Sequence, residues 1–346
     1  MDQNYGTTAI DEYAVDVTWE VADKTDIGVD MRLLNNKLNL QFDYFKESRK
    51  GIYLRRSSIP SYVGMINNPY GNIGKVENKG FELSVNYANS WGDWSLSLMG
   101  NYSFNRNEVL EDDSTVAYPW QNTIGNKVGQ RFGLVALGLF DSYEEIAASP
   151  VQTGDTRPGD IKYKDVNGDG KIDEYDKVPI GWGSVPEIMY GFGFSVGWKN
   201  LSLTAMFQGA AHVDAMLSGE GVLPFSQGSS RGNLLSNVTD RWTEENPRQD
   251  VFYPRLSIGN INMNYEESTW WLKDTDYLRL KNIELSYRLP DRWMKRIHLS
   301  NARIFIQGVN LLTFSSFKIW DVELGDGRGA KYPNIASVSL GINFNF

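Results

Sequence analysis

Cysteine is absent from the 346 residues, and histidine occurs only twice, at His212 and His298. Disulfide frameworks, thiol nucleophiles and cysteine-bound zinc are therefore excluded, and two distant imidazoles do not make an HExxH or histidine-rich metal site. Positive charge is in deficit, because 34 basic against 43 acidic residues give a formal net charge of −9. Proteins that bind nucleic acid usually carry a basic face, so no nucleic-acid partner is expected.

Long hydrophobic runs are missing as well. No stretch approaches the roughly 18 apolar residues that a membrane-spanning helix needs, and the polar residues after Met1 leave no apolar segment typical of a signal peptide. Aromatic residues, in contrast, are abundant: 11 Trp, 18 Tyr and 16 Phe, alongside 33 Gly. A polar average with many aromatic side chains is typical of proteins that cross a membrane with β-strands.

The dominant pattern is strict alternation of apolar and polar residues over segments of about ten residues, which predicts strands with two different faces. We count nine long strands. Short turns are predicted at 35–36, 90–92 and 199–200, with a modest one at 290–301, and long connections at 46–79, 105–186, 209–276 and 313–334. The alternating segments lie at 27–33, 38–44, 81–87, 94–104, 188–198, 201–207, 283–289, 304–306 and 338–346.

The long connections recur on every second link, so they all belong at one end of the sheet. Connections of this length are uncommon inside compact domains, and short turns at one end with long loops at the other is the layout of an outer-membrane barrel. A soluble sandwich or propeller also alternates, but it would not place every long loop on one side. The sequence therefore predicts an all-β fold, an antiparallel transmembrane β-barrel in contact with the lipid bilayer of the cell outer membrane.

Aromatic residues near the strand ends fit the two interfacial girdles of such a barrel. The alternative is that aromatic residues simply favour strands. Three cations, Arg279, Lys281 and Arg303, interrupt otherwise apolar strands and are expected on the polar interior side. The girdle candidates are Trp19, Tyr44, Trp91, Trp94, Trp198, Tyr287, Trp293 and Phe346.

Nine strands are an awkward number for a closed barrel. Bacterial single-chain barrels have an even strand count, and an open nine-stranded sheet would leave unpaired edges in lipid. We therefore expect residues 1–346 to be the C-terminal part of a larger barrel. The alternative is a missed strand within 127–140.

One local motif, at 165–176, predicts a bound ion. It has the offsets of the twelve-residue calcium loop, with oxygen ligands at positions 1, 3, 5, 9 and 12, a glycine (Gly170) at position 6 and a backbone carbonyl at position 7. The alternative is an Asn/Asp/Gly-rich surface turn without an ion. The predicted calcium-binding loop spans 160–177 within an extracellular loop, and its Ca²⁺ would be structural. The candidate ligands are Asp165, Asn167, Asp169, Lys171, Asp173 and Asp176.

Other candidate sites are weaker, and no catalytic constellation stands out, so an enzyme is not expected. Gly191, Gly193 and Gly197 lie inside an alternating strand and are better explained as part of a sheet face than as a dinucleotide-binding loop. The adjacent acids at 144–145 and 266–267 would serve a glycosidase only if other loops brought distant acids together. The tryptophans at 182 and 270–271 suit either stacking on sugars or packing.

The C-terminal third carries the strings WLKD (271–274), DYLRLKNIELSYRLP (276–290), QGVNLLT (307–313), YP (332–333) and GINFNF (341–346). Upstream come WE (19–20), NNKL (35–38), DYF (43–45), GKVENKGFE (74–82) and GDIKY (159–163). Together these strings resemble the SusC/RagA family of TonB-linked outer-membrane proteins of Bacteroidetes. The resemblance covers essentially the whole chain.

The resemblance implies a 22-stranded barrel, of which this chain would form the last nine strands, with Phe346 as the terminal assembly signal. It implies energised uptake of oligosaccharides or peptides, with a SusD-like surface lipoprotein as a lid. Contact with the TonB complex would come from the N-terminal part, which, like the plug domain and the first strands, is not in this sequence. Two other interpretations stay open: a self-contained β-protein for carbohydrate binding or adhesion, and, less favoured, a glycoside hydrolase built from the loops.

Overall fold

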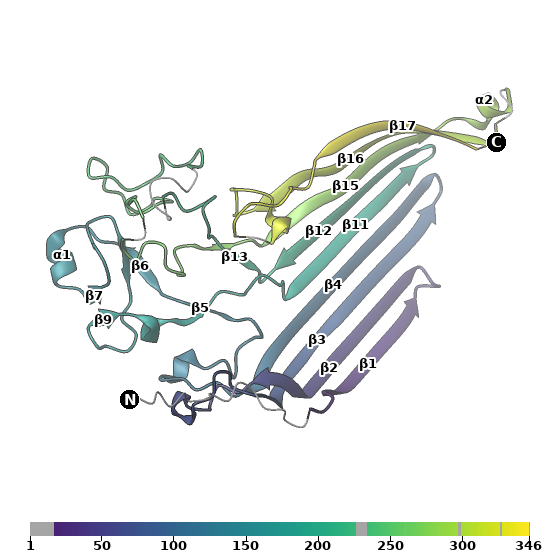
Figure 1. Cartoon of the computed structure of the whole chain (residues 1–346). Helices are drawn as coiled ribbons and strands as arrows, with labels where there is room; N and C mark the ends of the chain where they lie inside the picture. The colour runs from purple at the N-terminus through teal and green to yellow at the C-terminus, as the bar shows by residue number, and fades with distance from the viewer. Residues whose placement is uncertain (1–16, 226–233, 260, 297–298, 326, 346) are drawn as a thin grey trace, which may run out of the picture.

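The computed structural model describes residues 17–225, 234–259, 261–296, 299–325 and 327–345. Its main feature is a sheet of nine antiparallel strands in the order β1-β2-β3-β4-β11-β12-β15-β16-β17, which run side by side in Figure 1. The prediction of nine long strands is confirmed. Their bounds are β1 Val21–Leu33, β2 Leu38–Arg55, β3 Tyr70–Trp91, β4 Trp94–Glu111, β11 Ile188–Trp198, β12 Leu201–Ala211, β15 Tyr277–Arg288, β16 Asn301–Ser315 and β17 Ser337–Asn345.

The predicted short turns lie at one end of this sheet, which we call the turn end (Figure 1). Asn35 and Asn36 adopt φ of 56° and 66° between β1 and β2, a left-handed conformation that asparagine tolerates better than most residues. Gly92, at φ 59°, makes the turn between β3 and β4. The modest turn after β15 holds the short helix α2, Asp291–Arg296. The long connections gather at the opposite end, the loop end.

The predicted connection at 46–79 is wrong in its extent, because strands β2 and β3 continue through most of it. They remain paired up to Arg55 and Tyr70, which leaves only 56–69 as the loop. Strand β4 likewise continues to Glu111. Beyond Tyr44, Lys46 and Lys79 occupy positions of the apolar face, so the alternation ends although the backbone ladder does not.

The alternative of a missed strand of the main sheet within 127–140 is wrong, although the segment does form strands. That segment forms two short strands, which pair with other short strands of the loops rather than with the main sheet. The short strands are β5 Arg131–Gly133, β6 Ala136–Leu139, β7 Val151–Gln152, β8 Ile161–Tyr163, β9 Lys171–Ile172, β10 Val178–Ile180, β13 Asp214–Met216 and β14 Leu272–Asp274.

The main sheet has one apolar and one polar face, because alternate residues of a strand point to opposite sides. The apolar face stays open in the described residues, with Leu340 78% and Ile27 59% exposed. Strand β11 presents this face over 11 residues, about 33 Å at roughly 3.3 Å per residue. Tilted by about 40°, such a strand spans about 25 Å, the height of the apolar band of a membrane barrel.

Aromatic side chains border the apolar face at both ends. At the turn end, Trp91 lies opposite Trp94 and Trp94 opposite Trp198. At the loop end, Phe81 lies between Tyr44 and Phe104. The other girdle candidates are Tyr287, which lies in the turn-end row opposite Leu201, Trp19, which precedes β1 and is 92% exposed, Trp293, which lies on α2, and Phe346, which lies outside the described residues.

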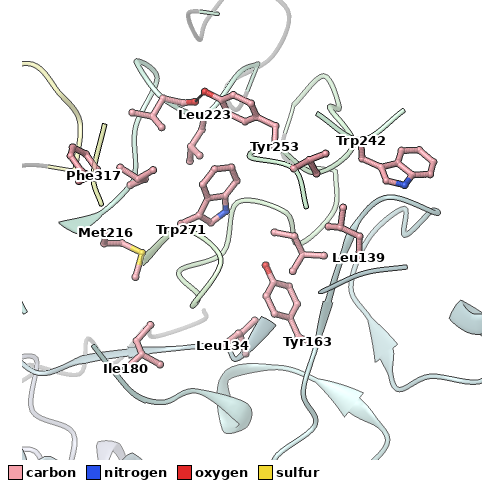
Figure 2. Close-up of a cluster of buried hydrophobic side chains, with 14 of the residues drawn as sticks. Leu134, Leu139, Tyr163, Ile180, Met216, Leu223, Trp242, Tyr253, Trp271 and Phe317 are labelled. Carbon is pink, nitrogen blue, oxygen red and sulfur yellow. Dashed lines mark hydrogen bonds between the residues drawn. The ribbon is translucent and has the colours of Figure 1, made fainter. Parts of the chain in front are cut away.

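The long connections fold into an assembly with its own hydrophobic core, drawn in Figure 2. Leu134, Ile161, Tyr253 and Trp271 are at most 1% exposed in it. Within the residues that the structure describes, no helix has the length and apolar character to cross a membrane. The helices of the loops are α1 Tyr143–Ala147 and four 3₁₀ turns, η1 Ser61–Val63, η2 Pro119–Gln121, η3 Glu174–Asp176 and η4 Val322–Leu324.

Candidate functional site

The polar face of the main sheet carries a cavity of about 510 Å³ between β2 and β12. Gly191 and Gly193 of β11 lie on this face, and a Cβ at Gly191 would come within 2.6 Å of Asn101 Oδ1. The glycines therefore remove side chains from the middle of the face, as expected of a sheet surface rather than of a dinucleotide loop. The polar-face residues around the cavity are Gln41, Asp43, Glu82, Ser84, Asn101, Ser103, Met189, Met206 and Gln208.

A second cavity, of about 520 Å³, lies in the loop assembly where 235–237 and 316–319 approach Phe252 and Lys273. Phe252 and Phe317 give it aromatic walls, and the Lys273 ammonium lies 5.4 Å above the Phe252 ring. Burial lowers the pKa of Lys273, because desolvation disfavours its charged form. The ammonium donates a hydrogen bond of 2.7 Å to the Trp270 carbonyl.

The adjacent tryptophans at 270–271 take different places. Trp271 is 1% exposed in the loop core (Figure 2). Its indole nitrogen donates to the Asn264 carbonyl at 2.7 Å. Trp270 is only partly buried and donates to the Phe252 carbonyl. For Trp271, packing is thus the correct alternative, and stacking on a sugar is excluded by its burial.

Buried tyrosines join the loop segments around Trp271. Tyr253 is fully buried and donates from its hydroxyl to the Val222 carbonyl, and Tyr163 donates to the Met263 carbonyl at 2.8 Å. Burial raises the pKa of Tyr253 to about 12, so its hydroxyl stays protonated and keeps donating at physiological pH. These bonds link loop segments that are far apart in the sequence into one body.

Asp160 holds two long loops together. Its carboxylate is 1% exposed and accepts two hydrogen bonds from Arg255, each of 2.9 Å. The amides of Asn262 and Asn264 add bonds of 3.1 and 2.8 Å. Sequence reasoning missed this clamp, and the only signal was the GDIKY string that contains Asp160.

Glu187 is a second buried carboxylate, placed where β11 begins. It is 4% exposed and accepts from Arg106 at 2.7 Å, Lys127 at 3.1 Å and His212 Nδ1 at 3.1 Å. Burial works to raise the pKa of Glu187, but the bonds from these three partners outweigh burial and lower it. The ionised Glu187 carboxylate therefore holds β4, the 112–130 loop and the end of β12 together.

Trp182 and His212, two aromatic residues close to Glu187, contact each other. Trp182 is 42% exposed and stacks on His212 with ring centroids 3.9 Å apart, so the His212 ring packs against Trp182 and contacts Glu187 through Nδ1. His298 lies outside the described residues.

The three cations predicted on the polar side each pair with a carboxylate. Arg279 is 3% exposed and pairs with Asp321 and Glu323. Lys281 lies 3.3 Å from Glu323. The pairs fasten the 316–336 loop onto β15, while Arg303 pairs with Glu284 of the neighbouring strand at 2.6 Å.

The adjacent acids also serve the loop structure. Glu145 accepts from Lys162 at 2.8 Å, and Glu266 lies 3.7 Å from Lys177. Glu145 also accepts from the Asp141 amide at 2.7 Å.

The predicted calcium loop is closed by its own side chains. Asp165 accepts from the amides of Gly168 and Gly170, and Asp176, fully buried, accepts from Val166 and Asp173. The remaining ligand candidates bond within the loop. Asn167 accepts from the Asp169 amide, Asp169 from the Lys171 amide, and Asp173 from the Tyr175 amide.

The donor set of this loop fits a hard cation, since it offers carboxylate, amide and carbonyl oxygens. The Lys171 ammonium, however, lies 3.2 Å from Asp173 and 3.8 Å from Asp169. The amide of Tyr175 lowers the pKa of Asp173, and Lys171 adds to the effect. Over the described part of the chain, no three His, Cys, Asp or Glu side chains are gathered as a metal site requires. Calcium stays a prediction.

The comparisons with known proteins agree with this architecture. The family model described as "TonB dependent receptor-like, beta-barrel" matches residues 1–311. The chain belongs to this family. Its members are β-barrel proteins of the outer membrane. The predicted fold and the predicted location in the outer membrane are thus both confirmed.

Individual relatives are receptors of the same type. The chain is 27% identical to TonB-dependent receptor P3 of Formosa agariphila, over 100% of this chain and 36% of that receptor. It is 24% identical to TonB-dependent receptor SusC of Bacteroides thetaiotaomicron, over 100% of this chain and 34% of SusC. A solved structure of the RagAB peptide transporter matches with a TM-score of 0.71 and 23% identity, over 95% of this chain and 36% of that one. The chain spans about a third of the length of these relatives.

Proposed function

We propose that this chain forms part of the wall and outer loops of a TonB-dependent importer of oligosaccharides or peptides. The observation that carries the proposal is the main sheet, which separates an open apolar face from a polar face and has every long loop at one end. In a closed barrel, the apolar face would lie in lipid and the polar face would line the lumen.

In this proposal the chain contributes binding and no covalent catalysis. The loop assembly and the polar-face cavity would capture the ligand, with the amides of Asn101 and Gln208 and the hydroxyl of Ser103 as hydrogen-bonding partners. Such groups suit sugar hydroxyls and peptide amides equally well. The chain would be the last nine strands of a 22-stranded barrel, and the plug and the TonB contact would belong to the N-terminal part of the same protein.

A SusD-like lipoprotein is the proposed partner at the loop end. The support is the likeness to SusC and to RagA-type structures, together with a loop assembly that is tied into one body by Asp160 and Glu187 and so offers a firm docking surface. The alternative of a self-contained carbohydrate-binding protein is less favoured, because β1 and β17 each pair on one side only in the described sheet.

The proposal predicts that deleting the native gene abolishes uptake of one class of oligosaccharide or peptide, and that a protonophore has the same effect on the wild type. Gln208→Leu should reduce uptake about fivefold, since it removes one hydrogen-bonding group worth about 1 kcal/mol. The measurement is accumulation of labelled glycan or peptide fractions by whole cells.

Gln307→Leu is the matched control, because Gln307 also lies on the polar face but outside the cavity, where it donates to Asn282. It should leave uptake unchanged. Normal uptake of every fraction in the deletion strain would contradict the importer.

A further inference from the structure

Three cations form a line across neighbouring strands on the apolar face of the sheet. Lys46 of β2 lies directly opposite Lys79 of β3, and Lys79 lies opposite Arg106 of β4. Tyr44, Phe81 and Phe104 lie opposite one another in the same way, each two residues nearer the turn end. Residues two apart on a strand share a face, so this cation row directly borders the loop end of the apolar band.

The row is unfavourable for the isolated sheet, since like charges directly opposite each other destabilise a strand pair. The side chains of Lys46, Lys79 and Arg106 nevertheless remain 46%, 48% and 43% exposed. Carboxylates lie on the side away from the apolar band. Glu77 pairs with Lys46 at 2.9 Å and with Lys79 at 3.4 Å, and Glu108 lies opposite Glu77.

Arg106 also borders a small cavity of about 180 Å³, which Lys127 and Trp182 line as well. Glu187 holds both cations from its buried position, through Nε and Nη2 of Arg106 and through Nζ of Lys127. Their charges also lie over the half-exposed Trp182 ring, at 5.8 and 5.3 Å. Tryptophan is enriched where a membrane protein meets the headgroup region, which is the depth that this cavity would occupy.

We propose that Lys46, Lys79 and Arg106 bind the phosphate groups of an anionic lipid of the outer leaflet, whose acyl chains lie against the apolar band below them. The carboxylates behind the row orient the cations toward the headgroups. Clusters of Lys and Arg at a membrane surface recognise anionic lipids in this way, and the adjoining apolar face supplies the contact that a lipid has and a free anion lacks.

The test uses the native outer-membrane protein that carries this chain, in nanodiscs of phosphatidylcholine and phosphatidylglycerol, with the lipids retained after detergent extraction counted by native mass spectrometry. The wild type should retain phosphatidylglycerol in preference to phosphatidylcholine. The K46Q/K79Q variant should lower that preference about fivefold per cation removed. Arg106 is left intact, because its loss would remove two of the hydrogen bonds to the buried Glu187 carboxylate.

The matched control is K24Q/R49Q, which removes two cations of the polar face that pair with Glu47; it should keep the preference. Folding of each variant is checked by its heat-dependent shift in gel mobility. Equal retention of both lipids by the wild type, or an equal loss in K24Q/R49Q, would overturn the proposal. Inorganic phosphate binding in a neutral detergent, with the same dependence on Lys46 and Lys79, would identify a free-phosphate site and overturn the lipid assignment.

Discussion

Asp169 is the residue at which calcium binding by the 165–176 loop is best tested. Its Oδ1 accepts the Lys171 amide at 3.0 Å, and asparagine can make the same bond without the charge. We therefore expect calcium to raise the melting temperature of the wild type, since an ion that binds only the folded state stabilises it by about 2.7 kcal/mol at 100 times its Kd. Asp169→Asn should weaken this response, and chelation should reverse it.

Glu174→Gln is the control for this loop, because the Glu174 side chain is 80% exposed and is not a ligand candidate. It should keep the full calcium response. Melting temperatures are read from intrinsic fluorescence in detergent, with and without EGTA. No shift on chelation in the wild type would show that the loop holds its shape by its own amide bonds and needs no ion.

Strands β3 and β4 approach each other closely at Gly80. A Cβ there would fall onto the backbone oxygen of Phe104 and within 3.1 Å of Asn105 Cα, as well as 2.6 Å from the Phe45 ring. Backbone atoms cannot move aside as a flexible side chain can. Gly80→Ala should therefore destabilise the sheet by about 1–3 kcal/mol, the usual range for overpacking.

Gly100 supplies the comparison within the same strand pair. A Cβ at Gly100 would meet only the Gly191 oxygen, at 3.9 Å, so Gly100→Ala should be nearly neutral. The measurement is the temperature at which the folded band converts to the unfolded band in gel electrophoresis. Equal conversion temperatures for the two variants would show that the strands separate at Gly80 without strain.

Strand elements were predictable from the sequence wherever lipid is expected on one side. The runs through Phe42, Leu98 and Phe192 alternate because one face is apolar, and the asparagine turn at 35–36 follows from turn chemistry. Beyond Tyr44 the alternation stops, since Lys46 and Lys79 replace apolar residues on that face, so the extension of β2 and β3 left no periodic signal. The short strands β5 and β6, of three and four residues, are too brief for periodicity to detect.

The loop assembly could be predicted only in part. The offsets of the 165–176 motif are local, so the sequence shows them directly. The clamp at Asp160, in contrast, joins residues 95 positions apart, and the burial of Trp271 depends on segments from several loops. Long-range contacts of this kind leave no spacing in the sequence, so their residues looked like ordinary polar or aromatic positions.

At the scale of the whole molecule, the described sheet leaves its two edge strands unpaired on one side. Strands β1 and β17 are the two edges of the described sheet, and unpaired strand edges are not viable in lipid. Further strands must therefore pair with both. Because relatives are about three times as long, we expect these strands to come from the same polypeptide.

An antibody against β16 and β17, applied to the native outer-membrane fraction, tests this expectation. It should detect a denatured band far above 39.2 kDa, near the size of the related receptors. Reactivity of the same band with serum raised against β1 and β2 controls for cross-reaction, since both epitopes lie within this chain. A band at 39.2 kDa would mean instead that the edges pair with a separate protein or a second copy. Crosslinking between engineered cysteines on β1 and β17 would then distinguish the two, because a second copy would give a covalent dimer of twice the mass on a denaturing gel and a separate protein would not.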